Sequence, residues 1–334
     1  MTIYRNILKQ AWQITWHSRW LWLFGLFAAV LGNGGIFNIL INNIASVQNQ
    51  GAIITNLNSL FAQGSIGAIG ASFVEVLSNL NFASFLVLLL ILVFGLFILW
   101  LAIVTQGGLI SGGFRLHKNQ PTSFKESWQR GLAKFWPVLW LNVATRVITY
   151  LLLVILGLPF FFLYVATQNL VWQWFLLVVS FMIFIPVAII IALLVQYAIM
   201  FVVVKNSEIK MSVKESWELF KKNWIVSIEM AVVLFIINIL AGLGLLISAL
   251  FILLPFLILG FLGVYFTINS LFVLAIILGG LVLVITVFIF GAILSVFKTT
   301  AWVILFTRLT EGTIIPKLLR LAESWSARKQ AKVE

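Results

Sequence analysis

Long apolar runs are the feature that most restricts what this chain can fold into. The run from Ile225 to Phe266 contains a single charged residue, Glu229, and comparable runs recur along the 334 residues. About 20 predominantly apolar residues suffice to cross a bilayer as a helix. Only 9% of the residues are charged, whereas a soluble domain carries roughly 25%. We therefore predict an all-α integral membrane protein, because a helix satisfies its own backbone polar groups in lipid.

Positive charge alternates with the apolar runs. Lys and Arg precede the first run, lie between the second and third and between the fourth and fifth, and gather at or after the end of the sixth. The intervening connections 45–81, 167–173 and 267–270 contain neither. Because Lys and Arg stay on the cytoplasmic side during insertion, the pattern predicts six spans with both termini in the cytoplasm. The predicted spans are 20–44, 83–112, 137–165, 173–204, 225–264 and 271–306.

Three of these spans contain residues that disfavour a straight helix. Gly32, Asn33, Gly34 and Gly35 interrupt the first span, and such a cluster breaks or thins a helix. Pro159 and Pro255 lie in the third and fifth spans, where each is expected to kink or end the helix near the outer surface. The fifth span is too long for one straight crossing, so we expect a bent helix. An alternative for 20–31 is the apolar part of a signal peptide.

A repeated motif divides the chain into units. Residues 123–128 (SFKESW) and 212–217 (SVKESW) match at five of six positions. Lys9, Trp12, Gln13 and Trp20 match Lys125, Trp128, Gln129 and Trp136 at a constant offset, and Glu323-Ser324-Trp325 echoes the motif in the tail. We predict one domain over 1–334, made of three units and closed by a final in-plane helix. Each unit is a helix in the membrane plane followed by a transmembrane hairpin.

The spacing within the motif predicts amphipathic helices. One face of the first helix carries Phe124, Trp128, Leu132 and Phe135, and one face of the second carries Val213, Trp217, Phe220 and Trp224. Basic residues face the other way, as in helices at the lipid headgroup boundary; packing of the apolar faces on protein is the alternative. Ser123 and Ser212 each precede a Glu by three residues, which is typical of a capping box. The predicted interfacial anchors are Trp12, Trp20, Trp128, Trp136, Trp217 and Trp224.

Missing residue types exclude much chemistry. The chain contains no Cys and no Asp, and its two histidines, His17 and His117, are flanked by basic residues. Thiolate metal sites, cysteine nucleophiles and paired-carboxylate catalysis are thereby disfavoured. We predict no enzyme activity, no cofactor and no metal. The net charge of +12 is expected to orient the protein in the membrane and to attract anionic lipids, and not to bind nucleic acid.

A few polar residues lie inside the predicted spans. Arg146 follows Trp136 by ten residues, which is about 15 Å along a helix, so it is expected near mid-membrane. The candidate buried polar or ligand site consists of Arg146, Asn142, Gln196, Glu229 and Asn238. It is either a structural clamp between helices or a site for an anion or lipid headgroup. Gln106, Asn142 and Tyr197 are expected to form interhelical hydrogen bonds. Gly107-Gly108 and Gly112-Gly113 are expected to permit either close helix approach or helix fraying.

The sequence resembles a known membrane family at its boundary motifs. Residues 16–27 (WHSRWLWLFGLF), the Lys-Glu-Ser-Trp elements and the six-span layout are similar to the membrane domain of glycerophosphoryl diester phosphodiesterases and related prokaryotic six-span proteins. The resemblance implies a prokaryotic cytoplasmic membrane. It implies no activity, because catalysis in that family belongs to a separate soluble domain for which this chain has no room.

These observations favour a non-enzymatic membrane protein that engages anionic lipids, or membrane protein partners, through basic amphipathic helices on the cytoplasmic face. The alternative is a transporter or channel for a lipid or small anion, with Arg146 in its pathway. A third class, an intramembrane enzyme, is disfavoured by the missing residue types.

Overall fold

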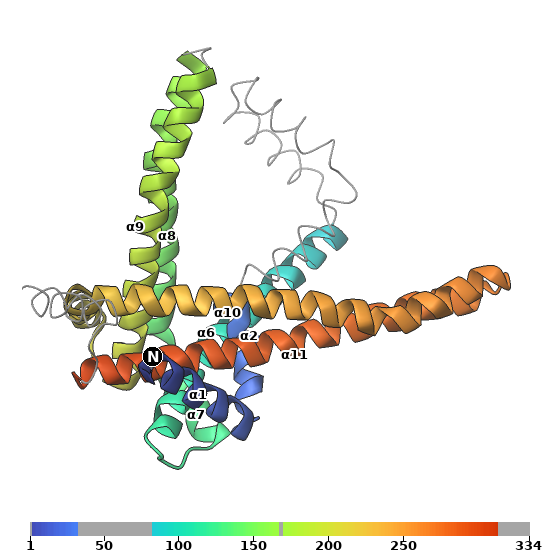
Figure 1. Cartoon of the computed structure of the whole chain (residues 1–334), viewed down its shortest axis with the longest axis horizontal. Coiled ribbons are helices and arrows are strands. Elements are labelled where there is room, and N and C mark those ends of the chain that lie inside the picture. The colour runs from blue at the N-terminus through green and yellow to red at the C-terminus, as the bar shows by residue number, and fades with distance from the viewer. Residues whose placement is uncertain (1, 33–81, 167–169, 313–334) are drawn as a thin grey trace, which may run out of the picture.

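The computed structural model describes residues 2–32, 82–166 and 170–312, and every regular element in these ranges is an α-helix (Figure 1). The helices are α1 (Thr2–His17), α2 (Leu21–Gly32), α6 (Phe82–His117), α7 (Phe124–Ala133), α8 (Phe135–Ala166), α9 (Leu170–Val204), α10 (Ile209–Tyr265) and α11 (Asn269–Thr310). Within the described residues, α6, α8, α9, α10 and α11 are long and apolar enough to cross a membrane. The all-helical fold and the multi-pass membrane class are thus supported.

The long helices leave a common base in different directions. In Figure 1, α8 and α9 run together as one arm, α10 and α11 form a second, and α6 points in a third direction. We define the base as α1, α2 and α7 together with 100–117 of α6, 135–142 of α8, 193–204 of α9, 209–234 of α10 and 287–310 of α11. The remainders of the long helices are the arms.

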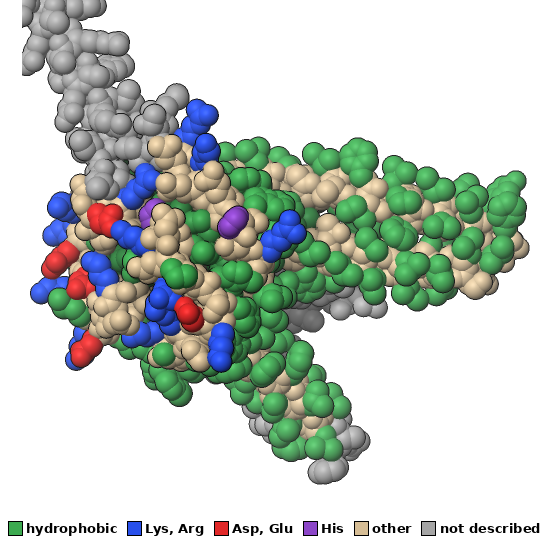
Figure 2. Space-filling model, turned by 90° about the horizontal axis from the view of Figure 1, so that it is seen from below, with side chains coloured by type: hydrophobic (Ala, Val, Ile, Leu, Met, Phe, Trp, Pro, Cys, Tyr) green, Lys and Arg blue, Asp and Glu red, His purple; other side chains and the backbone are tan. Residues whose placement is uncertain are grey.

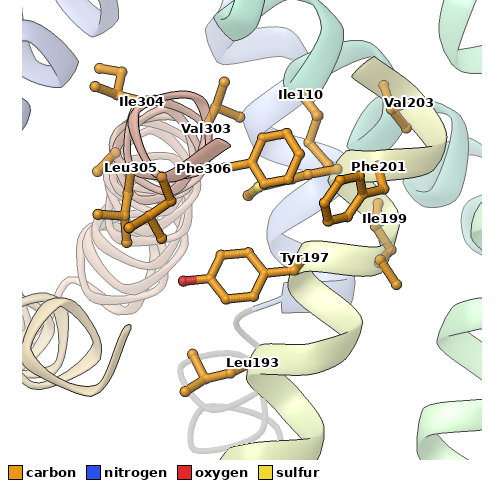
Figure 3. Packing of buried hydrophobic residues seen from close by; sticks show 14 of the residues in the cluster. Ile110, Leu193, Tyr197, Ile199, Phe201, Val203, Val303, Ile304, Leu305 and Phe306 are labelled. Carbon is orange, nitrogen blue, oxygen red and sulfur yellow. The ribbon is translucent and has the colours of Figure 1, made fainter. Parts of the chain in front are cut away.

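The buried core lies in the base. Tyr197 and Phe201 of α9 pack against Phe306 of α11, and the Phe201 and Phe306 rings meet edge to face at 4.9 Å between centroids (Figure 3). A second, smaller cluster joins α2, α6 and α11. On the arms the apolar side chains are largely exposed; Leu250 and Phe251 are 69% and 73% accessible. Such an apolar surface matches lipid rather than water as its surroundings.

The predicted repeat recurs as three equivalent breaks between a short helix and a longer one. α1 ends at His17 and α2 begins at Leu21, while α7 and α8 are separated by Lys134 alone. α10 bends at Asn223, which has non-helical dihedral angles of φ −131° and ψ 30°. Ser18, Lys134 and Asn223 occupy the same position in the three units when the Trp12, Trp128 and Trp217 positions are aligned. The sequence repeat therefore coincides with a break between helices, or a bend, at the same position of each unit.

Pro159 and Pro255, each expected to kink or end its helix, do not end it. Pro255 does not end its helix, since α10 continues to Tyr265, and the described bend in α10 is at Asn223 instead. α8 likewise continues beyond Pro159 to Ala166. Neighbouring helices hold these backbones in place, because α10 packs along α11 and α8 along α9; tertiary packing of this kind lets membrane helices tolerate proline.

The capping prediction holds for one motif only. The Ser123 hydroxyl accepts a hydrogen bond from the Glu126 backbone N–H at 3.4 Å and caps α7. Ser212 does not cap a helix, because α10 already begins at Ile209 and the buried Ser212 hydroxyl donates to the Ile209 carbonyl at 2.8 Å.

The described residues cover most of the predicted spans. The span 20–44 is described only as far as α2, whereas 83–112, 137–165, 225–264 and 271–306 fall within α6, α8, α10 and α11, and 173–204 within α9. The remainder of the glycine-rich interruption, the connection 45–81 and the tail motif at 323–325 lie outside the described residues.

Candidate functional site

Each short helix turns its small residues toward the protein. Ala11 and Thr15 of α1 are fully buried, and so are Ser212 and Ser216 at the start of α10. In α7 the buried residues are Ser127 and Gly131. These pairs are four residues apart and therefore share one helical face. The face that contacts the protein is thus a stripe of small residues, beside the predicted aromatic face.

Close approach explains why small residues are needed there. A Cβ added at Gly131 would overlap the Val104 carbonyl oxygen of α6 and lie 3.0 Å from the Gly108 backbone nitrogen. A Cβ at Gly107 would lie 3.3 Å from the Gly131 Cα. The prediction that Gly107 and Gly108 permit close helix approach is confirmed, and the approaching helix is α7.

The predicted anchors divide into exposed and packed tryptophans. Trp12, Trp217 and Trp224 are 53%, 47% and 52% accessible, and Trp136 is exposed as well. Trp20 and Trp128 are half-buried. Trp20 and Trp128 both meet Phe24 of α2, at 5.8 and 6.2 Å between ring centroids.

The two predicted aromatic faces differ: at the start of α10, Val213, Trp217 and Trp224 are directed outward, whereas Phe124 and Trp128 of α7 pack on Phe24 of α2. Phe124, Leu132 and Val213 are exposed, while Phe220 is buried. Exposed aromatic rings on a helix of mixed polarity are typical of a membrane-interface position.

Basic side chains gather on the base (Figure 2). The short helices expose Arg5, Lys9, Lys125, Arg130, Lys210, Lys214, Lys221 and Lys222. The arms are covered mainly by apolar side chains in the same view. The boundary between the two surfaces is where the short helices meet the long ones, so aromatic and cationic groups lie together at that boundary.

Two ion pairs connect elements of the base. Arg115 of α6 pairs with Glu126 of α7, and Lys118 pairs with Glu311 after α11. The hydrogen bond from Lys118 lowers the pKa of the Glu311 carboxyl. These contacts neutralise two of the basic side chains, whereas the exposed lysines of α10 have no ion pair within the described residues.

The predicted polar site is distributed over separate contacts. Asn142 of α8 donates to the Gln106 side-chain carbonyl of α6 at 3.0 Å. Glu229 of α10 accepts a hydrogen bond from Tyr4 of α1, and Asn238 of α10 accepts one from Lys298 of α11 at 3.3 Å. Asn142 and Asn238 thus connect helices.

The remaining members of that set lie apart from these contacts. Gln196 of α9 is half-buried, and Arg146 lies on an exposed face of α8. Tyr197, expected to connect helices, shares a hydrogen bond with Ser227 of α10 at 2.8 Å.

Sequence reasoning missed Lys298 as a polar residue that connects helices. Its side chain is half-buried and reaches from α11 to Asn238 of α10, although its position favoured grouping it with the positive charges at or after the end of the sixth span. The signal was present, because Lys298 precedes the last residue of the predicted span by eight positions.

Histidine and carboxylate groups do not converge in the described ranges. His17 is exposed and His117 is half-buried. Among the residues that the structure describes, no three His, Cys, Asp or Glu side chains come together in a way that could hold a metal ion.

Comparison with known proteins identifies no relative of this chain. No family model, no curated protein sequence and no solved structure matches this chain.

Proposed function

We propose that this chain is a non-enzymatic, six-span protein of the cytoplasmic membrane whose short basic helices bind anionic lipid headgroups. The observation that carries the proposal is which side chains lie at the boundary between the base and the arms. There, the second and third repeat units each combine exposed lysines or arginines with tryptophan, directly beside the apolar arms of α8 and α10.

The proposed membrane placement follows from the arms. We propose that the arms cross the bilayer, that 20–44 forms the first span, and that both termini are cytoplasmic. The distribution of Lys and Arg supports this orientation: the turn between α10 and α11 contains neither, whereas the turns at 118–123 and 205–208 each contain a lysine. The resemblance to prokaryotic membrane domains suggests the cytoplasmic membrane as the location.

The chemistry of binding is electrostatic attraction combined with interfacial anchoring. A Lys or Arg near an anionic membrane surface contributes roughly 1 kcal/mol, and its aliphatic stem can lie along apolar surface while the charge reaches the phosphate layer. Trp217 and Trp224 flank Lys221 and Lys222 on the first part of α10. Exposed rings of this kind favour headgroup depth, where the four exposed lysines of this segment would meet anionic headgroups.

Lipid selectivity of the purified full-length protein tests the proposal. In uncharged detergent, the protein is titrated with phosphatidylglycerol or phosphatidylcholine, and bound lipids are counted by native mass spectrometry. The variant replaces Lys210, Lys214, Lys221 and Lys222 with Gln, and its matched control replaces the same four with Arg. We expect the Gln variant to bind phosphatidylglycerol at least about tenfold more weakly, and the Arg control to be unchanged.

Two results would contradict the proposal. One is equal affinity of the unmodified protein for phosphatidylglycerol and phosphatidylcholine. The other is unchanged phosphatidylglycerol binding by the Gln variant.

A further inference from the structure

One face of α8 is polar where it leaves the base. Asn142, Thr145, Arg146, Thr149 and Tyr150 follow the spacing i, i+3, i+4, i+7 and i+8, which places them on a single helical face. The rest of this part of α8 is apolar, and Val143, Val147 and Ile148 are exposed to the surroundings. A polar stripe on an arm with lipid-like surroundings is costly unless it has a polar partner.

The stripe begins at the contact between α8 and α6. Both side-chain N–H groups of Asn142 are used, one toward Gln106 and one toward the Val138 carbonyl at 2.8 Å. Arg146 lies one turn farther from the base on the same face. Figure 1 shows α6 and α8 leaving the base in different directions, and the α6 residues Leu96 and Phe97, farther along its arm, are exposed. Arg146 therefore stands where the two helices separate.

The charged group and the free amide group at this place are donors. The Arg146 guanidinium carries five N–H donors, and it forms no hydrogen bond or ion pair with the described residues. The Gln106 side-chain carbonyl is occupied by Asn142, so its NH2 group remains as the available part of that amide. Helices α6, α8 and α9 contain no Asp or Glu. A counter-ion for Arg146 is therefore missing from all three helices that build this part of the molecule.

Helix geometry directs the Arg146 side chain toward the interface. Side chains on a helix lean toward its N-terminus, which for α8 is the base. The exposed Trp136 and Trp140 lie ten and six residues before Arg146, about 15 and 9 Å along the helix. A long side chain that leans back closes part of this gap and brings the guanidinium toward the depth of lipid phosphates.

We propose that Arg146, assisted by the Gln106 amide, binds the phosphate of one anionic phospholipid whose acyl chains lie along the exposed apolar surfaces of α6 and α8. The guanidinium fork matches two phosphate oxygens, and the apolar residues around it match the chains. This site lies on an arm, apart from the base lysines, and it rests on the proposed function only for the presence of a membrane around the arms.

The affinity of the full-length protein for the first lipid that it binds tests the site. In uncharged detergent, native mass spectrometry measures the affinity for a single phosphatidylglycerol in the unmodified protein and in Arg146→Gln, Arg146→Lys and Ser248→Ala variants. We expect Arg146→Gln to bind the first lipid about tenfold more weakly, and Arg146→Lys to be intermediate because it keeps the charge without the fork. Ser248→Ala is the matched control on the α10 arm, because the Ser248 hydroxyl donates within its own helix to the Leu245 carbonyl, and it should leave the first lipid unchanged.

Soluble phosphate separates a lipid site from a general anion site. We expect millimolar inorganic phosphate or glycerol 3-phosphate to leave the first phosphatidylglycerol bound. Displacement by either would overturn the assignment to a membrane lipid. Unchanged first-lipid affinity in Arg146→Gln would overturn the site itself.

Stability separates binding from a structural role. The melting temperature of Arg146→Gln in lipid-free detergent should equal that of the unmodified protein, and a clear decrease would show a structural clamp and overturn the proposal. If Arg146→Gln does not fold, Gln106→Leu serves as the second variant, with the same expected loss of the first lipid. Loss of the later lipids alone would follow from the base lysines, so failure of this site and failure of the proposed function give different results.

Discussion

Gly131 of α7 lies so close to Val104 of α6 that a Cβ at Gly131 would overlap the Val104 carbonyl oxygen. Gly131→Ala should therefore push α7 away from α6 and lower stability by about 1–3 kcal/mol, as overpacking does. Gly157→Ala is the matched control, because nothing lies within 4 Å of a Cβ at that position. Thermal unfolding in detergent measures both, and an equal effect of the two substitutions would contradict the close contact.

The hydrogen bond between Tyr4 and Glu229 connects the first helix to α10. Tyr4→Phe and Glu229→Gln should each lower stability, and a double-mutant cycle should show coupling of about 1 kcal/mol between them. Arg146 and Glu229 should show almost no coupling, since Glu229 is bonded to Tyr4 on the base and Arg146 lies on the exposed face of α8. Strong coupling between Arg146 and Glu229 would contradict this arrangement of the helices.

Tryptophan depth tests the position of the short helices. In a variant that keeps Trp217 as its only tryptophan, fluorescence should be quenched best by lipids labelled near the headgroup, because the ring is exposed beside the basic face. A variant that keeps only Trp128 should respond less, because that ring packs on Phe24 and Phe124. Efficient quenching of Trp217 by a water-soluble quencher alone would place the helix away from the membrane.

Sequence patterns predicted the elements better than the contacts between them. Apolar length identified the five long described helices, because a lipid-facing helix must be apolar along its whole span. The repeat motif anticipated α7, since its capping serine and periodic aromatic residues are local features. The face that α7 buries was predicted less well, because a close contact selects small residues such as Ser127 and Gly131, which carry little hydrophobic signal.

The polar site shows where sequence reasoning ends. Arg146 and Glu229 were grouped because both are charged residues in apolar runs, but depth along a helix says nothing about which face a neighbour occupies. Asn238 was identified, whereas its partner Lys298 was counted with the positive charges at or after the end of the sixth span. Interhelical pairs of this kind depend on rotation and register, which only the three-dimensional arrangement supplies.

Sidedness of the base and of an arm tip tests the central claim most directly. The chain has no cysteine, so single-cysteine variants can be labelled in intact cells and in inverted vesicles with a membrane-impermeant maleimide. We expect Asn206→Cys, in the turn before α10, to react only from the cytoplasmic side, and Thr267→Cys, in the turn between α10 and α11, only from the outside. Labelling of both cysteines from the same side would contradict a protein whose basic helices lie at the cytoplasmic face while its arms cross the membrane.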